Sequence, residues 1–498
     1  MTIADPQTLT DVRLVRHWIG GREVGEPTIE RHAPATGELV ALYADATAEE
    51  VDAAVAAART TFESETWQST VHGQRASWLE RFAEILTENR QRLAEIDAQE
   101  VGKPLAFALG DIDLGIAHVR QAAAIARTET GEAFPGVSHG YLAVGERRAL
   151  GVVGLVIPWN FPAQIMLQKL PYALAAGCTT VVKPSEFTSS SAVVIAQLAE
   201  AAAIPAGAVN VVTGYGRTAG QGILEHADVA YVSFTGSTRT GRVVAETAAR
   251  QLKRVGLELG GKAANVVFAD ADLEKAADGA VFGAFINQGE SCVATTRLIV
   301  QRSIAERFTA MVVSRAAKLR LGRPEDPEAD LGALIHPPHR DAVAAAVDAA
   351  VAAGGVLELG GEIPGGELSD GAFYPPTIVS GVDPTSALFS EEVFGPVLAV
   401  SVFDDDDDAV ALVNATSYGL AHSLWTTDLD RGVNLGRRLE AGTIWVNTCT
   451  DGSPQLAFGG VKASGYGRDA GFEGYREFTE YRTLQIRTAE RTSPFAGR

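Results

Sequence analysis

The chain has 498 residues, a length that suits two large domains better than one core. Hydrophobic residues make up 46% and charged residues 21%, as in globular enzymes rather than disordered chains. The formal net charge of -20 argues against binding to nucleic-acid phosphates or to anionic membranes. We therefore expect no nucleic-acid partner and no membrane partner.

The cysteines are too few and too far apart for a disulfide framework or a zinc motif, so no metal site is expected. They are Cys178, Cys292 and Cys449. Residues 1–11 are polar and lack the apolar core of a signal peptide, and no uncharged apolar run reaches membrane-span length. These features predict a cytoplasmic protein. The acidic run 404–408 is interpreted as a solvated loop or helix start rather than a cation site.

Helical periodicity dominates residues 48–127, with apolar residues at i, i+3 and i+4. Apolar runs of strand length then alternate with helical segments, a pattern typical of a parallel α/β sheet. These runs are residues 151–157, 179–184, 209–214 and 229–234. A second α/β series follows Gly261. Its expected strands are 265–268, 298–300, 398–403 and 443–446, with helices from Leu273 and Ile304.

Cys292 is the sharpest chemical candidate, between a helical stretch and a strand and flanked by small residues. A free thiol with a pKa of about 8.5 is only a few per cent ionised at pH 7, so activating it costs roughly 2 kcal/mol. A helix N-terminus or a polarised neighbour can supply that much. Taken alone, Cys292 is better explained as a buried structural cysteine.

Other polar residues follow the predicted strands. Glu258 follows the apolar strand 255–257 and precedes two glycines, where a carboxylate can face a cleft and activate water. Asn160 follows the first strand and either donates to an oxyanion or caps the next helix. Lys183 and Glu186 end the second strand, where open α/β sheets bind ligands. Residues 234–241 open a helix whose N–H groups suit a pyrophosphate, although they lack a strict Gly-x-Gly-x-x-Gly fingerprint.

Together these motifs resemble the aldehyde dehydrogenase superfamily from about Trp18 to Leu484. The five main motifs occur in the family's order, and two further segments reinforce the resemblance. The motifs are residues 158–162, 183–186, 234–241, 258–262 and 287–296, with 391–396 and 458–468 as the reinforcing segments. The resemblance implies an α/β fold of two doubly wound, Rossmann-like lobes with a small β oligomerisation element.

By the resemblance, Cys292 matches the nucleophile, Glu258 the general base, and Asn160 the side chain that binds the oxyanion with the Cys292 backbone N–H. Lys169 matches a lysine near the proton-release route. The implied reaction oxidises an aldehyde to a carboxylic acid through a thioester on Cys292, which water activated by Glu258 then hydrolyses. A relative that transfers the acyl group to coenzyme A usually lacks the base, a non-catalytic relative would be expected to lose Cys292 or Glu258, and an unrelated Rossmann alcohol dehydrogenase does not fit the weak glycine fingerprint.

The resemblance also implies NAD(P) as cofactor. Lys183 and Glu186 lie beside the adenosine ribose, and NAD is favoured over NADP because Glu186 would repel a 2′-phosphate. Lys183 works in the opposite direction and would tolerate a phosphate. The full set of implied cofactor residues is Ile157, Trp159, Lys183, Glu186, Gly236, Ser237, Leu259, Glu392 and Phe394.

The substrate is less well defined. Asp111 resembles an acidic position of amino-aldehyde oxidisers, and Gln168 occupies a position that is often aromatic in relatives. Another acidic position of that pattern is Leu114 here, so a polar or cationic aldehyde and a general aliphatic or aromatic aldehyde both remain open. The residues expected to line the substrate tunnel are Asp111, Gln164, Gln168, Ser291, Val293, Thr450 and Phe458.

Three positions depart from the family pattern. Glu290 stands where many relatives carry Gln, and we expect its charge to face away from the Cys292 sulfur. Ala457 replaces a common Pro and loosens its loop. Asp469 replaces a Glu, which puts a proton-relay role there in doubt.

The implied domains are an NAD-binding domain, a catalytic domain and an oligomerisation arm. They comprise residues 1–130 with 150–260, residues 261–462, and residues 131–149 with 477–498, respectively. The strand-like segments 141–150 and 480–487 are too long and too apolar to stand alone as sheet edges, so a homodimer or homotetramer is expected.

Overall fold

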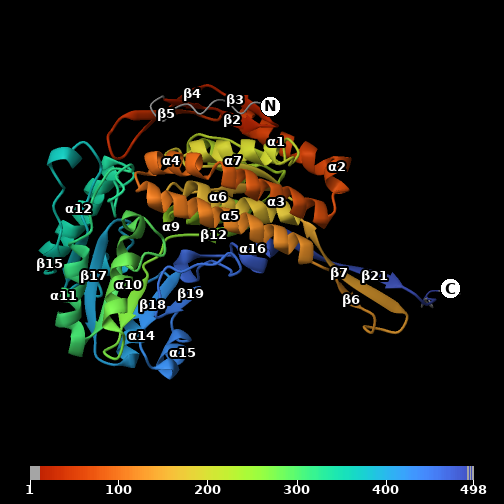
Figure 1. Ribbon diagram of the computed structural model, residues 1–498. Coiled ribbons are helices and arrows are strands. Elements are labelled where there is room, and N and C mark those ends of the chain that lie inside the picture. The colour runs from red at the N-terminus through yellow and green to blue at the C-terminus, as the bar shows by residue number, and fades with distance from the viewer. Residues whose placement is uncertain (1–11, 491–492, 494, 496–498) are drawn as a thin grey trace.

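The computed structural model describes residues 12–490, 493 and 495. The prediction that residues 1–11 lack a signal peptide lies outside the described residues. So do residues 491, 492, 494 and 496–498 of the expected arm. Figure 1 shows two lobes and a β arm that projects from them. Within the described residues, no helix is long and apolar enough to cross a membrane, and no three His, Cys, Asp or Glu side chains are grouped to hold a metal ion.

The first lobe is built on an eight-stranded sheet of order β20-β12-β11-β8-β9-β10-β2-β3. Its five central strands are parallel, and the chain starts in the middle and winds first one way and then the other. These strands are β8 (Val152–Val156), β9 (Thr179–Lys183), β10 (Val209–Val211), β11 (Val229–Thr235) and β12 (Arg254–Glu258). The antiparallel edge strands are β2 (His17–Ile19), β3 (Arg22–Val24) and β20 (Gly465–Tyr466).

Helices cover both faces of this sheet because successive strand residues alternate in direction. Val153 and Leu155 of β8 join one core cluster, and Val152 joins the other. The first cluster includes helices α3 (His72–Glu88), α4 (Arg90–Val101), α5 (Leu105–Thr128), α6 (Pro162–Ala176) and α7 (Ser190–Ala201). The second includes α1 (Ala48–Glu63), α8 (Gln221–Glu225) and α9 (Thr238–Arg250). The short α2 (Glu65–Gln68) follows α1, and a π-helical turn η1 (Gly216–Gly220) precedes α8.

The second lobe holds a seven-stranded sheet of order β15-β16-β17-β14-β13-β18-β19, parallel except at β15. Its strands are β13 (Ala264–Val267), β14 (Arg297–Gln301), β15 (Val356–Leu359), β16 (Thr377–Ser380), β17 (Val397–Phe403), β18 (Ala421–Trp425) and β19 (Thr443–Val446). Its helices are α10 (Leu273–Phe285), α11 (Ala305–Ala316), α12 (Pro337–Ala352), α13 (Ala387–Ser390), α14 (Asp406–Asn414) and α15 (Leu429–Gly436). Its 3-10 turns are η2 (Ile286–Gly289), η3 (Arg302–Ile304) and η4 (Gly366–Leu368). Asp405 caps α14, so the acidic run forms a helix start.

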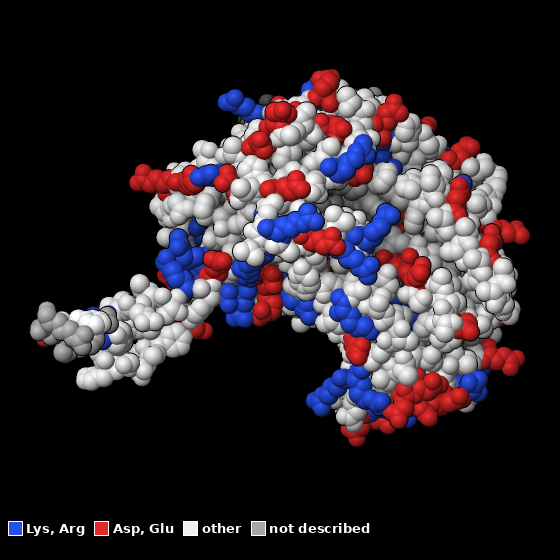
Figure 2. All heavy atoms as spheres, turned by 180° about the vertical axis from the view of Figure 1, so that it is seen from behind, with Lys and Arg blue, Asp and Glu red and all other residues white. Residues whose placement is uncertain are grey.

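The projecting arm is a sheet of order β21-β7-β6, in which β21 and β7 pair along their whole length. Its strands are β6 (Glu132–Phe134), β7 (Tyr141–Ala149) and β21 (Thr479–Arg487), and α16 (Gly471–Glu477) leads into it from η5 (Lys462–Ser464). The segments 141–150 and 480–487, which were expected to need a pairing partner, thus pair with one another. Within the described chain the outer edge of β21 has no partner strand. On the face in Figure 2 most of the arm is neither acidic nor basic.

The predicted α/β fold with two parallel sheets is confirmed. The strands before residue 48 were not predicted, since most are only three residues long or are exposed. Besides β2 and β3 they are β1 (Arg13–Val15), β4 (Pro27–His32) and β5 (Leu39–Ala44), which form a small separate sheet.

Candidate active site

Cys292 lies in the loop between η2 and β14, at the junction of the two lobes. The backbone of the Glu258 loop touches it: a Cβ added to Gly261 would lie 2.2 Å from the Cys292 carbonyl oxygen. Gly289, with φ of 72°, approaches Gly395 equally closely on the other side. Only glycine fits at these two contacts, and they bring three separate sequence motifs onto one loop.

The Cys292 thiol is held in its protonated form. Burial raises its pKa to about 12, and the carboxylates of Glu392 and Glu258 add to the shift, against the backbone N–H groups of Cys292 and Val293. The neighbouring Glu290 is engaged elsewhere, because its carboxylate accepts a hydrogen bond of 2.9 Å from the Ile335 N–H. Reaction with an electrophile therefore requires loss of the thiol proton to a base.

Glu258 ends β12 and is buried. Its Oε2 has no hydrogen-bond partner among the described residues. Burial raises the pKa of this carboxyl well above its usual value, and the charge of Asp469 raises it further. A buried carboxylate with a free oxygen and a raised pKa is a stronger base than an ordinary carboxylate, which suits it to take a proton from water.

Asn160 follows β8 and is held from two directions. Its side-chain Nδ2 donates to the Glu290 carbonyl at 2.9 Å. Its backbone carbonyl accepts from Lys103 Nζ at 2.8 Å and from Asn287 Nδ2 at 3.3 Å. It does not cap the next helix, whose N-cap is Phe161 without a side-chain bond. A side-chain amide has two N–H donors, so one remains for an oxyanion.

Lys169 on α6 is fully buried in a polar cluster next to Glu258. Its Nζ donates to Ser233 Oγ at 2.8 Å and to Asp469 Oδ2 at 2.5 Å. Asp469 thus reaches the lysine despite being shorter than Glu, and its charge also acts on Glu258. The three residues are electrostatically linked.

Lys183 and Glu186 stand together at the carboxyl end of β9. Lys183 Nζ lies 2.8 Å from the Pro184 carbonyl and 3.4 Å from Glu186 Oε2. The pair offers one cation and one acceptor, which fits the hydroxyl groups of a ribose.

Further along the same edge, Ser237 caps α9 by accepting from the Thr240 N–H. The first N–H groups of such a helix have no partner within it and suit a pyrophosphate. Gly236 precedes the cap, and Leu259 and Ile157 are buried. Leu259 packs closely on α9, because a Cβ added to Gly241 would lie 2.4 Å from its side chain.

Aromatic rings and a carboxylate flank the other side of the Glu258 loop. Phe394, with φ of 58°, packs edge-on against Trp159 with ring centroids 5.4 Å apart. His339 Nε2 lies 2.8 Å from the Phe394 carbonyl. Glu392 accepts from the Gly261 N–H at 3.0 Å, and burial raises the pKa of its carboxyl to about 7. Together with the β9 edge, these groups fit a dinucleotide.

The predicted substrate residues come from several elements of both lobes. Ser291 and Val293 adjoin Cys292, Gln164 and Gln168 lie half-buried one turn apart on α6, and Thr450 and Phe458 follow β19. The Phe458 backbone pairs with that of Asp469 at 2.8 Å. Asp111 on α5 is bound to Lys103 Nζ at 2.7 Å, so its charge is balanced. That pairing weakens the argument for a cationic aldehyde.

Lys103, Asn287 and His339 belong to the site but were not predicted. Lys103 occupies a Gly-Lys-Pro turn between two helical runs, where a lysine is usually solvated. Asn287 belongs to the Cys292 motif, and its positive φ of 53° leaves no signal in the residue pattern. His339 had no motif around it.

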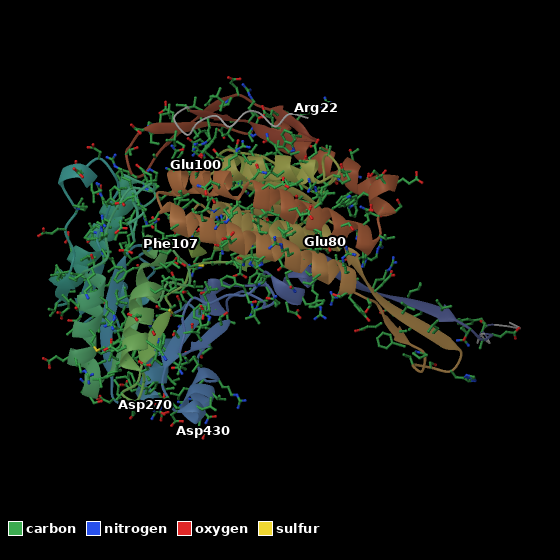
Figure 3. All side chains as sticks on the ribbon, viewed as in Figure 1. Arg22, Glu80, Glu100, Phe107, Asp270 and Asp430 are labelled. Carbon is green, nitrogen blue, oxygen red and sulfur yellow. The ribbon has the colours of Figure 1, made fainter. Side chains whose placement is uncertain are left out.

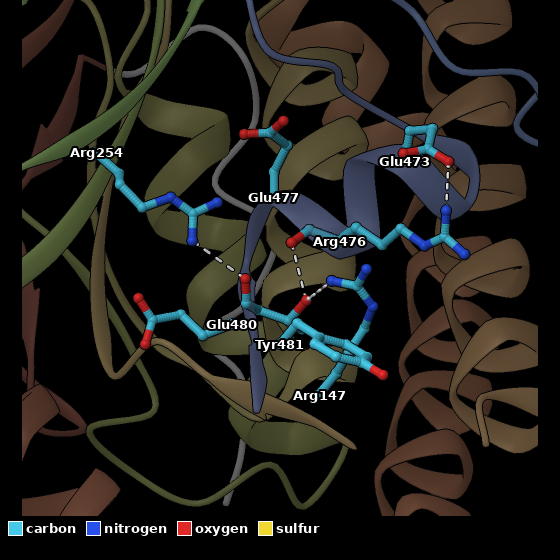
Figure 4. Close-up of a pocket in the computed structure, with 8 residues that line it drawn as sticks. Arg147, Arg254, Glu473, Arg476, Glu477, Glu480 and Tyr481 are labelled. Carbon is cyan, nitrogen blue, oxygen red and sulfur yellow. Dashed lines mark hydrogen bonds and ion pairs between the residues drawn. The ribbon is translucent and has the colours of Figure 1, made fainter. Parts of the chain in front are cut away.

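An open cavity of about 580 Å³ lies at the base of the arm (Figure 4). There Arg254 donates to the Thr479 carbonyl at 3.2 Å and Arg147 to the Thr479 hydroxyl at 3.1 Å. Arg476 pairs with Glu473 at 2.7 Å. None of the predicted site residues lines this cavity.

Comparison with known proteins matches residues 18–484 to the aldehyde dehydrogenase family model. An aminoacetaldehyde dehydrogenase from Pseudomonas aeruginosa is 43% identical, over 93% of each chain. An NAD-dependent aldehyde dehydrogenase from Sinorhizobium meliloti superimposes with a TM-score of 0.96 at 39% identity, covering 99% of this chain and 98% of that one. The aldehyde dehydrogenase of Bacillus cereus in its NAD+ complex gives 0.94 at 35%, covering 97% and 98%.

The geometry and the comparisons agree over nearly the whole chain. A cysteine beside the Glu258 loop, a buried carboxyl and polar groups at the end of β9 are compatible with the thioester chemistry that is general to this family. The chain belongs to the aldehyde dehydrogenase family and oxidises an aldehyde to a carboxylic acid with NAD(P)+.

Proposed function

We propose that Cys292 is the nucleophile and Glu258 the general base of this aldehyde dehydrogenase. The observation that carries the proposal is the contact of Gly261 with the Cys292 carbonyl, which fixes the Glu258 loop against the nucleophile. The Cys292 thiol gives up its proton to a base, and the resulting thiolate adds to the aldehyde carbon. The remaining N–H of Asn160 with the Cys292 N–H stabilises the oxyanion, where one donor is worth roughly 3 to 4 kcal/mol. The aldehyde itself cannot release hydride. Addition converts it into a tetrahedral adduct whose oxyanion can.

NAD(P)+, held by the residues at the end of β9 together with Glu392 and Phe394, would supply the hydride acceptor. Loss of hydride from the adduct would convert it to a thioester on Cys292. Water then attacks the thioester, and Glu258 takes its proton. Lys169 and Asp469 form the buried path by which we infer this proton leaves, because both act on Glu258 and bond each other. Collapse of the hydrated adduct breaks the carbon–sulfur bond. The carboxylic acid departs, and the Cys292 thiolate takes up a proton to restore the thiol.

Substitution Glu258→Gln separates the two half-reactions. The variant is expected to release one equivalent of NADH in a rapid burst and then stall, with steady turnover lower by about 10²- to 10⁴-fold, because no base activates the water. Stopped-flow absorbance of NADH measures both phases. Cys292→Ala is the control and should produce no burst while still binding NAD+. Normal steady turnover by Glu258→Gln would exclude the base assignment.

We propose a preference for NAD over NADP. The residues proposed to bind the cofactor are Lys183, Glu186, Ser237, Gly236, Trp159, Ile157, Leu259, Glu392 and Phe394. Glu186 would meet a 2′-phosphate as a like charge, at an unfavourable energy of a few kcal/mol when partly buried. Glu186→Gln should therefore raise kcat/KM for NADP relative to NAD by about tenfold. Glu225→Gln, at an exposed site on α8, is the matched control. An unchanged ratio in Glu186→Gln would remove the charge argument.

We also propose the remaining assignments. Residues 1–130 with 150–260 bind the cofactor, 261–462 carry the nucleophile, and 131–149 with 477–498 form an arm that joins copies into a homodimer or homotetramer. Free thiols at all three cysteines agree with a reducing, cytoplasmic setting. The residues proposed to line the substrate tunnel are Asp111, Gln164, Gln168, Ser291, Val293, Thr450 and Phe458.

A further inference from the structure

A lysine is buried in the turn between α4 and α5. Gly102, in the left-handed conformation with φ of 94°, ends α4, and Lys103 follows with its side chain fully excluded from solvent. Glu100 and Phe107, labelled in Figure 3, lie on the two helices that flank this turn. A buried ammonium group is costly unless its N–H donors find partners, so its contacts define its role.

The Lys103 ammonium contacts the loop that carries the proposed oxyanion donor. It donates to the Asn160 carbonyl at 2.8 Å, and it stands 4.1 Å from the centre of the Phe161 ring. Its charge is balanced by Asp111, 2.7 Å away. Lys103 therefore holds the peptide between Asn160 and Phe161 by a hydrogen bond to its oxygen and by a contact with the Phe161 ring.

A second residue of the same helical layer holds the other end of this loop. Asp97 on α4 is buried and accepts from the Ala163 N–H at 3.2 Å, in the first turn of α6. Asn287 supports the Asn160 carbonyl from the nucleophile side at 3.3 Å. Of the described groups that bond the Asn160 carbonyl, Lys103 is the charged one, and charge-assisted bonds are roughly twice as strong as neutral ones.

We propose that Lys103 is a positioning residue that orients Asn160 for oxyanion binding; this rests on the proposed role of Asn160. Without the ammonium group, the carbonyl loses its strongest donor and the peptide can tilt, which displaces the Asn160 side chain. A misplacement of about 1 Å in such a group slows chemistry by on the order of 100-fold. Lys103 does not touch the reacting atoms.

The test is a double-mutant cycle on the rate of the NADH burst, using the full-length enzyme with NAD+ and one good aldehyde. Lys103→Met, which keeps the length but removes the donors, should slow the burst by about 10- to 100-fold. In an Asn160→Ala background the same change should have almost no further effect, because Lys103 acts through that side chain. NAD+ binding, measured by fluorescence titration, should be unchanged.

Glu100→Gln is the matched control. Glu100 is a buried charge three residues before Lys103, but its carboxylate pairs with Arg13 and Ser190 on another side. This change is expected to lower Tm without slowing the burst. If Lys103→Met does not fold, Lys103→Gln, whose amide retains a neutral donor, goes through the same cycle with a smaller expected slowing.

The outcomes are distinct. Multiplicative effects of the Lys103 and Asn160 changes, or a normal burst in Lys103→Met, would overturn the inference while leaving the role of Asn160 standing. A normal burst in Asn160→Ala itself would instead refute the proposed oxyanion role, and with it the premise on which the inference rests.

Discussion

Cys292 must lose its proton in surroundings that favour the thiol. Two carboxyl groups and burial act together to raise its pKa, and the opposing groups on its own chain are backbone N–H donors. Metabolic enzymes work near neutral pH, so activation has to accompany binding of the reactants. In the proposed mechanism Glu392 serves the cofactor and Glu258 the hydrolysis step, and these roles account for two carboxyl groups close to the thiol.

The reactivity of free Cys292 should therefore climb steeply with pH. Only the thiolate attacks iodoacetamide, and with a pKa of about 12 the alkylation rate should rise about tenfold per pH unit from pH 7 to 10 without a plateau. Mass spectrometry of the modified peptide follows the reaction. Cys292→Ala reports any background from Cys178 and Cys449, whose pKa values burial raises to about 11. A plateau below pH 9 would contradict the expectation.

At the residue scale, the sequence allowed prediction of side chains that sit at strand ends, since strand ends are marked by apolar runs and proline stops. Glu258 and Asn160 were predicted in this way. Asn160 bonds the Glu290 carbonyl of the Cys292 loop, and Glu258 belongs to the loop that touches Cys292 through Gly261. Lys103 could not be found, because burial of a lysine depends on acceptors that lie eight and fifty-seven residues away. No local pattern records such partners.

Among the elements, the arm carries exposed apolar side chains on its last strand. Leu484 and Ile486 on β21 are 50% and 41% exposed and point to the same face, two residues apart. The free edge of β21 beside them is a pairing site for another strand. This combination supports the proposal that the arm joins copies of the chain.

Replacing both residues with lysine should weaken that association. The double variant Leu484→Lys/Ile486→Lys is expected to shift the mass in light scattering after gel filtration toward the single chain, because two charges would have to be buried. The control is Leu429→Lys/Val433→Lys, which puts the same charges on an exposed face of α15. An unchanged mass for the β21 variant would argue against an interface on this face.

The element scale also shows where prediction from sequence stopped. Long apolar strands such as β8 and β17 were located to within a residue or two, because buried parallel strands need continuous apolar runs. β20, two residues long, pairs with β12 from about two hundred residues further along the chain. Its position is set by the closure of Gly465 against Leu257, which a hydrophobic pattern does not encode.

Across the whole molecule, the two lobes meet where their motifs touch. The Glu258 loop belongs to the end of the first sheet, and Cys292 leads into the second, yet the two backbones are in contact at Gly261. The predicted strands 151–157, 179–184, 209–214 and 229–234 belong to the first sheet, and 265–268, 298–300, 398–403 and 443–446 belong to the second. The predicted division into lobes did not show that the last segment, with β20 and α16, returns to the first lobe, because that return depends on packing between distant parts of the chain.

The pairing of β7 with β21 has a consequence for synthesis of the chain. About 330 residues separate the two strands, from Ala149 to Thr479. At about 5 to 20 residues per second, a ribosome needs roughly 20 to 60 seconds to add the second strand after the first. During that interval β7 has only the short β6 as a partner. A prematurely terminated chain would therefore expose one open edge of β7, where chaperones and proteases would find extended, unpaired backbone.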